Sequence, residues 1–209
     1  MKALVICDDY WHPARTVRNG LAPLAAAGVA FDWIEDSVDW SAERMAAYPL
    51  AVLSKSNNVS SADRNPWMTE EVEQAFLDYV RKGNGLLAIH SGTADYREAV
   101  ILRGLLGGVF THHPPQCPVT VLPRAGHPLA GCPEFTEVDE HYFMAMDDPG
   151  VEIFLTTVSE HGTQPGGWTR REGDGRVCVL TPGHNEAVWL HPSFQTILRN
   201  GLDWCATAT

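Results

Sequence analysis

Apolar positions in the first half of the chain alternate between a spacing typical of strands and one typical of helices. Four short apolar runs bounded by glycine or polar residues are expected to be buried strands: Lys2–Cys7, Val29–Ile34, Leu50–Leu53 and Leu86–Ile89. Helical spacing covers Ala14–Ala27, and further helices are expected after the N-cap residues Ser41 and Thr69, the last ending at Gly83. This order is typical of an open parallel sheet with helices on both faces.

The second half of the chain has several short strands separated by proline and glycine. The expected strands are Val119–Leu122, His141–Met146, Val151–Thr157 and Arg176–Leu180. A closing helix is expected over Leu190–Trp204. The predicted fold class is therefore α/β, an open and mostly parallel sheet with helices on both faces and a β-rich insertion in the second half. Because no repeat or linker is visible, residues 1–209 are expected to form a single domain.

Composition and charge narrow the classes of partner. The 209 residues are 44% hydrophobic and 20% charged, an ordinary globular balance, and the formal net charge is -11. An acidic chain disfavours nucleic acid and anionic membranes as partners. The N-terminal apolar run is too short for a signal peptide, and no stretch is long enough to span a bilayer. Five scattered cysteines indicate reduced thiols, so a cytoplasmic location is expected.

Polar and aromatic residues follow several of the expected strands. In open α/β sheets ligands bind beyond the carboxyl ends of the strands, which predicts a site there. The candidates at these ends are Trp11, His12, Asn58, His90, His184 and Glu186. For His12 and Asn58 a structural role in a loop is an equally good interpretation, and for Trp11 core packing is the better one. Trp168, among glycines, is expected in a mobile loop.

His90 is the residue least readily explained by structure alone. It stands where the strand Leu86–Ile89 stops at a run of small residues, a pattern that predicts a sharp strand-to-helix turn. The positive end of a helix disfavours imidazolium, so this ring is expected to be neutral at pH 7. A neutral imidazole can act as a base, accept a hydroxyl hydrogen bond or bind a metal. A buried, satisfied histidine is the alternative, but function is favoured.

Several segments, in order, resemble the ThuA-like family of trehalose-utilisation proteins. They are "GLLAIHSGTADY", "LLGGVFTHHPPQCPVTV", "HPLAG" followed by "DEHYF", and "GRVCVLTPGHNEAVW" followed by "PSFQTILRNGLDW". The resemblance runs from about Leu4 to Trp204 and implies a flavodoxin-like, class I glutamine amidotransferase-like fold. Those amidotransferases have a cysteine at the strand-to-helix turn and a later His-x-Glu pair. Here the pair is His184 and Glu186, but His90 replaces the cysteine, so glutamine amidotransferase activity is not expected.

The family resemblance implies a role in disaccharide metabolism, with trehalose-like or keto-sugars as the small-molecule partner. The first hypothesis is an enzyme, a sugar hydrolase, isomerase or lyase, with His90, His184 and Glu186 as catalytic residues and Glu186 orienting His184. The expected sugar-binding residues are Trp11, His12, Asn58, His113 and Glu140. The second hypothesis is a non-catalytic sugar-binding or regulatory protein on an amidotransferase-like scaffold.

No cofactor is certain from the sequence. The "GNG" at Gly83 precedes a strand rather than following one, which argues against a bound nicotinamide cofactor. A divalent metal such as zinc is an alternative, with His90, His113 and His184 as candidate ligands. A histidine-rich pocket without metal is preferred, since the adjacent pair His112 and His113 would point to opposite faces of a strand. A homo-oligomer is expected on general grounds only.

Overall fold

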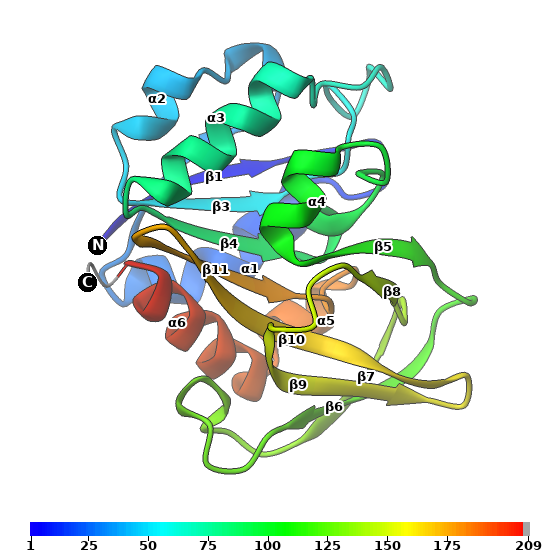
Figure 1. The fold of residues 1–209 in the computed structure, drawn as a ribbon. Coiled ribbons are helices and arrows are strands. Elements are labelled where there is room, and N and C mark those ends of the chain that lie inside the picture. Colours follow the sequence, from blue (N-terminus) through cyan, green and yellow to red (C-terminus); the bar gives the residue numbers. More distant parts are fainter. Residues whose placement is uncertain (207–209) are drawn as a thin grey trace.

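The computed structural model describes residues 1–206, in which nine strands form one mixed sheet (Figure 1). Five neighbouring strands run parallel, in the order β2 (Ala30–Ile34), β1 (Lys2–Cys7), β3 (Leu50–Ser54), β4 (Gly85–Ile89) and β11 (Gly175–Leu180). The sheet continues antiparallel through β10 (Gly162–Glu172), β9 (Glu152–Ser159), β6 (Cys117–Pro123) and β7 (Phe135–Asp139). A separate antiparallel pair contains β5 (Gly108–His112) and β8 (Phe143–Met146).

Helices cover both faces of the parallel part of the sheet. One face carries α1 (Ala14–Ala26), α5 (Glu186–Leu190) and α6 (Pro192–Ala206), and the other carries α2 (Ala42–Ala46), α3 (Glu70–Arg81) and α4 (Val100–Leu106) (Figure 1). Short 3-10 turns complete the chain: η1 (Ser37–Asp39), η2 (His90–Thr93) and η3 (Pro128–Ala130). Successive side chains of a strand point to opposite faces of the sheet. Val5 of β1 therefore packs in the core on the α1 side, and Ile6 packs in the core on the α3 side. The α/β class is confirmed.

Local signals placed most elements of the first half correctly. The expected strands there are present within one residue at each end, and Ser41 and Thr69 cap α2 and α3 by accepting from backbone amides. The expected closing helix is confirmed as α6, which begins at Pro192, two residues later than expected, while Leu190 ends the separate short helix α5. Proline lacks a backbone N–H and holds the residue before it, His191, in an extended conformation.

Trp168 corrects one prediction, since it lies on β10 and not in a mobile loop. Its side chain is fully buried, and its Nε1 donates to the carbonyl oxygen of Leu106 at 2.7 Å. The neighbouring Gly166 and Gly167 lie at a bulge in the pairing of β10 with β9. Glycines inside a strand often mark such a bulge, and their clustering made this strand look like a loop.

The core also contains two cysteine thiols, one in β1 and one in β11, which are the first and last of the parallel strands in chain order. Cys7 and Cys178 are buried and free, in β1 and β11. Burial raises the pKa of Cys7 to about 12, so this thiol is a poor nucleophile. Among the helices of residues 1–206, none combines the length and apolar character needed to cross a membrane.

Candidate functional site

Three histidines and one glutamate converge beyond the strand ends of the sheet. His12 follows β1, His90 follows β4, His184 follows β11, and Glu140 comes directly after β7. One ligand atom from each, an imidazole nitrogen or a carboxylate oxygen, lies within 4.8 Å of all the others. We call these four residues the histidine–glutamate cluster. Its position agrees with the rule that ligands bind at the carboxyl ends of strands in open α/β sheets.

The ring orientation of His90 is fixed by a hydrogen bond on the side that faces away from the cluster. Its backbone φ of 47° is in the left-handed region, at the sharp turn from β4 into η2. Nδ1 lies 2.8 Å from the carbonyl oxygen of Thr181, so Nδ1 carries the hydrogen and Nε2 presents a lone pair to the cluster. Burial lowers the pKa of His90, although contact with Glu140 opposes this shift. Burial is therefore the main reason why the imidazole ring of His90 is expected to be neutral.

His12 is held in the same way by a carboxylate. Its Nδ1 lies 2.8 Å from Oδ1 of Asp9, whose Oδ2 also accepts from the backbone N–H of Ser56 at 2.8 Å. Burial would raise the pKa of Asp9, but the hydrogen bond and charge of His12, together with the backbone N–H donors of Ser56 and Trp11, outweigh burial and hold the pKa below its usual value. Asp9 is therefore a carboxylate that fixes the ring and turns Nε2 of His12 toward the cluster.

His184 and Glu140 form the other side of the cluster. Nδ1 of His184 lies 3.1 Å from Oε2 of Glu140, and Nε2 of His90 lies 3.4 Å from the same oxygen. Burial would raise the pKa of Glu140, but the two histidines hold it well below its usual value. The buried carboxylate of Asp139 fixes the loop of His184 by accepting from the backbone N–H groups of Gly183 and His184, at 2.8 and 2.9 Å.

The donor set of the cluster fits a divalent cation. Nε2 of His12, Nε2 of His90 and Nδ1 of His184 are buried, and within residues 1–206 none has a hydrogen-bond partner of good geometry. Three imidazoles and one carboxylate are a typical ligand set for zinc. In a tetrahedral site, ligand atoms about 2.1 Å from one ion lie roughly 3.4 Å apart, so the widest pairs of the cluster, at up to 4.8 Å, would have to close by about 1.4 Å on binding the ion. Asp9 and the carbonyl of Thr181 supply the outer support that metal-binding histidines usually have.

A cavity of about 280 Å³ opens onto the cluster. Its walls include the aromatic rings of Trp11, Phe110 and Tyr142 and the titratable groups of Asp95 and His113. The ring of Tyr142 stacks on His90, with centroids 3.9 Å apart, whereas Trp11 is 56% exposed at the rim. Apolar rings with a few convergent polar groups are typical of a small-molecule site. We call this space the cluster cavity.

The structure places the remaining expected site residues elsewhere. Glu186 does not orient His184: its Oε2 accepts from Asn19 Nδ2 at 2.8 Å on an exposed surface, because the first turn of α5 faces α1. Glu140 contacts His184 instead. Asn58 is buried, and its side-chain oxygen accepts a hydrogen bond from the backbone N–H of Tyr10, in the loop after β1, at 3.4 Å. It does not line the cluster cavity.

His113 lies in the cluster cavity but outside the cluster. Its Nε2 is 3.5 Å from Oε1 of Glu140, and its Nδ1 donates to the carbonyl oxygen of Pro114 at 2.7 Å. It is therefore replaced by His12 in the set of candidate metal ligands. The sequence reasoning missed the supporting roles of Asp9 and Asp139. Only the position of Asp9 at a strand end could have indicated it.

The sheet and the cluster at its carboxyl edge define an α/β protein with a histidine-rich candidate ligand site. The chain belongs to the ThuA family, described as trehalose utilisation, whose model matches residues 2–205. Among curated proteins, no sequence matches the chain.

Solved structures show the same fold at low sequence identity. A ThuA-like protein from Parabacteroides merdae is 20% identical with a TM-score of 0.76, covering 99% of this chain and 90% of its own. A ThuA-like protein from Bacteroides uniformis, also 20% identical, has a TM-score of 0.74 and coverages of 98% and 91%. The β-galactosidase of Rahnella sp. R3 is 16% identical with a TM-score of 0.69, over 96% of this chain but 31% of the enzyme. Family membership supports a role in sugar metabolism.

Proposed function

We propose that this protein is a divalent-metal enzyme of carbohydrate metabolism that acts on a sugar carrying a ketone. The observation that carries the proposal is the set of three buried imidazole nitrogens, none with a hydrogen bond of good geometry, around the Glu140 carboxylate. Buried polar atoms of this kind are rare unless a ligand satisfies them. The family's connection with trehalose utilisation supports a sugar as the substrate. This proposal replaces the earlier preference for a pocket without metal.

His12, His90, His184 and Glu140 would hold the metal ion. When bound there, the ion would act as a Lewis acid that draws electron density from the carbonyl oxygen of the sugar. The rest of the reaction depends on the chain's own residues. Trp11 and Phe110 offer apolar faces for the C–H side of a sugar ring, and both line the cluster cavity.

His113 is placed to move the proton. Because its Nδ1 donates to Pro114, its Nε2 has a free lone pair that can take a proton from the carbon next to the ketone. The C–H electron pair then moves into the carbon skeleton and the carbonyl oxygen becomes an enolate. The carboxylate of Glu140, 3.5 Å from that Nε2, stabilises the resulting imidazolium. Where the attacked carbon carries a hydroxyl, transfer of the hydroxyl proton to the enolate oxygen and return of the carbon-bound proton from His113 to the former carbonyl carbon give isomerisation. Where the next carbon carries a leaving group, its departure with the C–O electron pair re-forms the ketone, the imidazolium of His113 protonates the departing oxygen, and the reaction is an elimination.

The cellular setting proposed is the cytoplasm. Two structures of the same fold are from cytoplasmic proteins of Salmonella typhimurium, at 16% and 13% identity. We extend this location to the present chain.

The cluster cavity has no cysteine among its lining residues in the described part of the chain, which gives no support for a thioester route.

The metal is tested on tag-free protein by elemental analysis and thermal melting. We expect about one equivalent of zinc or a similar ion, and a clear fall in Tm after chelation, since a ligand at about 100 times its Kd adds roughly 2.7 kcal/mol. His12→Gln and His184→Gln should each lose the ion. His161→Gln, a matched change at an exposed histidine outside the cluster, should retain it.

Two results would change the conclusion. Absence of metal and an unchanged Tm after divalent ions are added back would overturn the metal enzyme. Retention of metal and of sugar binding, without turnover of any member of a panel of keto-sugars, would favour the non-catalytic binding protein.

A further inference from the structure

A strained backbone marks three residues other than glycine in residues 1–206: Asp8 (φ 70°), His90 (φ 47°) and Asp95 (φ 62°). Strain of this kind is costly and persists mainly at functional sites. His90 belongs to the histidine–glutamate cluster, and the carboxylate of Asp8 accepts from the backbone N–H of Ala14 at 2.8 Å, at the first residue of α1. Asp95, in the loop between η2 and α4, has neither role, so its conformation needs another explanation.

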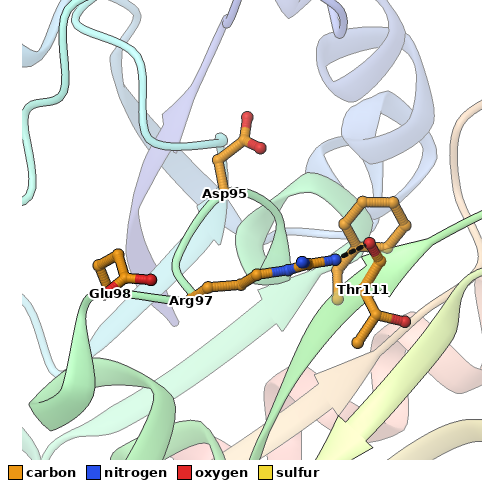
Figure 2. A pocket seen from close by; sticks show the side chains of 5 residues that line it. Asp95, Arg97, Glu98 and Thr111 are labelled. Atoms are coloured by element: carbon orange, nitrogen blue, oxygen red, sulfur yellow. Dashed lines mark hydrogen bonds between the residues drawn. The ribbon is translucent and has the colours of Figure 1, made fainter.

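The two residues after Asp95 hold this loop in place. Tyr96 is fully buried, and its hydroxyl donates to the carbonyl oxygen of Lys55 at 2.7 Å. Arg97 extends from the loop to β5, where its guanidinium donates to the carbonyl oxygen of Thr111 (Figure 2). Because the chain is anchored at both residues, the backbone at Asp95 fixes the direction of its side chain.

The side chain of Asp95 lines the cluster cavity without a partner. It also lines an adjoining hollow of about 290 Å³, whose wall it shares with Arg97. Its carboxylate nevertheless points away from Arg97 in Figure 2, and within residues 1–206 it takes part in no hydrogen bond or ion pair. Partial burial and the nearby charge of Asp9 raise the pKa of Asp95, so this carboxylate takes up a proton more readily than an ordinary aspartate does.

The other titratable groups of the cluster cavity already have roles or hold their protons too firmly or too weakly. The cluster histidines would bind the ion, and His113, once it carries the carbon-bound proton on Nε2, cannot accept a second one. Against the effect of burial, the cluster histidines hold the pKa of Glu140 well below its usual value, which makes it a weak base. Burial raises the pKa of Tyr142 well above its usual value, so its hydroxyl stays protonated. Among the described residues that line the cavity, Asp95 remains as a proton acceptor.

We propose that Asp95 is a second proton carrier in the cluster cavity, which moves the hydroxyl proton of the sugar to the enolate oxygen during isomerisation. Its carboxylate takes the proton from the hydroxyl of the attacked carbon, and the O–H electron pair stays on the sugar oxygen. The carboxylic acid then gives this proton to the enolate oxygen, so Asp95 ends as the carboxylate it was at the start. His113 moves the carbon-bound proton alone. Asp95 is thus a catalytic residue of the proposed function, on which its role rests.

Deuterium exchange in heavy water separates the two proton transfers. The probe is 1,5-anhydro-D-fructose, a ring ketone beside a hydroxyl-bearing carbon, with the zinc-loaded protein. Removal of the carbon-bound proton by His113 appears as deuterium at that carbon in NMR spectra, whereas isomerisation also requires the hydroxyl proton to move. Asp95→Asn should lower the isomerisation rate about 100-fold or more and keep metal content, KM and the exchange rate within about threefold of wild type. His113→Gln should lose exchange and isomerisation together.

Two further variants serve as controls. Asp39→Asn, a matched change at an exposed aspartate outside the cluster cavity, should alter neither rate. Asp95→Gly accepts the left-handed backbone without strain, so it should fold at least as well as wild type and show the same selective loss of isomerisation. Thermal melts of all variants check their folding.

The outcomes distinguish the role of Asp95 from the proposed function itself. Equal loss of exchange and isomerisation in Asp95→Asn and Asp95→Gly, or equal retention of both, would overturn the role of Asp95 and leave the metal enzyme intact. Elimination in place of isomerisation, at an unchanged rate in Asp95→Asn, would do the same. Neither exchange nor product with the wild-type protein would overturn the proposed function, and the role of Asp95 with it.

Discussion

His90 donates its Nδ1 hydrogen to the carbonyl oxygen of Thr181, across 2.8 Å, from the end of β4 to the end of β11. A carbonyl oxygen can only accept, so the neutral ring keeps its hydrogen on Nδ1 and its lone pair on Nε2. Burial lowers the pKa of this ring, which keeps it neutral near pH 7. One backbone oxygen thereby decides which nitrogen of His90 faces Glu140.

The first prediction concerns this tautomer. In metal-free protein at pH 7.5, two-dimensional ¹⁵N–¹H spectra of the histidine rings should show His90 with a protonated Nδ1 and an unprotonated Nε2. Adding zinc should shift the Nε2 resonance, because that nitrogen would become the ligand. A protonated Nε2 in the metal-free protein would contradict the assignment.

The second prediction concerns Asp9, which orients His12 from outside the cluster. Asp9→Asn should weaken metal affinity by about 10–100-fold, as loss of an outer carboxylate partner usually does. Competition with a chelating dye measures the affinity. Since Asp9 also accepts from Ser56, the change should lower the free energy of unfolding by about 1–3 kcal/mol, seen as a fall in Tm.

Ser56→Ala is the matched control for Asp9→Asn. It keeps the backbone N–H that donates to Asp9 and removes only the side-chain hydroxyl, so metal affinity should stay unchanged. Metal affinity within twofold of wild type in Asp9→Asn would show that the carboxylate does not position His12.

The sequence was sufficient to predict the strand ends of the first half and three members of the cluster. His12, His90 and His184 were candidates because each follows an apolar strand of the parallel sheet, where the general rule places ligands. The alternation of apolar residues also separated the two cores, since neighbours such as Val5 and Ile6 must face opposite sides. These inferences depend on local pattern alone.

The roles of Glu140 and Glu186 show where the sequence reasoning failed. Glu140 was expected in the site as a sugar-binding residue, whereas Glu186 was expected to orient His184 because the family resemblance pairs the two in a His-x-Glu motif. Glu140 follows β7, at the far edge of the antiparallel half, and the loop after that strand returns to the cluster. Pairing order in an antiparallel extension depends on long-range contacts, which periodicity in the sequence does not encode.

The third prediction concerns Trp11, which is 56% exposed yet lines the cluster cavity. An exposed aromatic side chain contributes little to folding but offers a flat face to a sugar. Trp11→Ala should weaken binding of methyl α-glucoside about tenfold and change the free energy of unfolding by less than about 0.5 kcal/mol. Trp11→Phe should recover most of the affinity. A large loss of stability without loss of binding would assign Trp11 to packing.

The fourth prediction concerns pH and His127, which is buried and stacks on Phe154 with centroids 5.1 Å apart. Its Nδ1 accepts from the backbone N–H of Leu129 at 3.2 Å, and burial lowers its pKa below the usual 6.5 in spite of Glu152. The unfolded chain therefore takes up this proton first as pH falls. The stabilisation by His127 is fully present above pH 6.5 and is lost below it, until the folded state also protonates.

Urea unfolding at pH 7.5, 6.5 and 5.5 measures this effect. Wild type should lose more stability between pH 6.5 and 5.5 than His127→Gln does, and other buried histidines cancel in the comparison. Parallel losses in the two proteins would show that His127 has the same pKa in the folded and unfolded chains.

The fifth prediction compares two glycines in helices. Gly20 in α1 packs against Trp189, and a Cβ at this position would lie 2.6 Å from that ring. Gly104 in α4 has open space around its Cβ position. Gly20→Ala should therefore destabilise the fold by about 1–3 kcal/mol through overpacking, whereas Gly104→Ala should stabilise it by about 0.5–1 kcal/mol through the better helix propensity of alanine.

The same pair tests how α1 is connected to the cluster. Nε1 of Trp189 donates to the carbonyl oxygen of Gly183 at 2.6 Å, directly before His184, so displacement of Trp189 by Gly20→Ala should shift that loop. Metal affinity, measured with the same dye, should fall in Gly20→Ala and stay unchanged in Gly104→Ala. If Gly20→Ala lowers Tm but binds metal as wild type does, the loop of His184 is held by Asp139 alone, through its bonds to the backbone of Gly183 and His184.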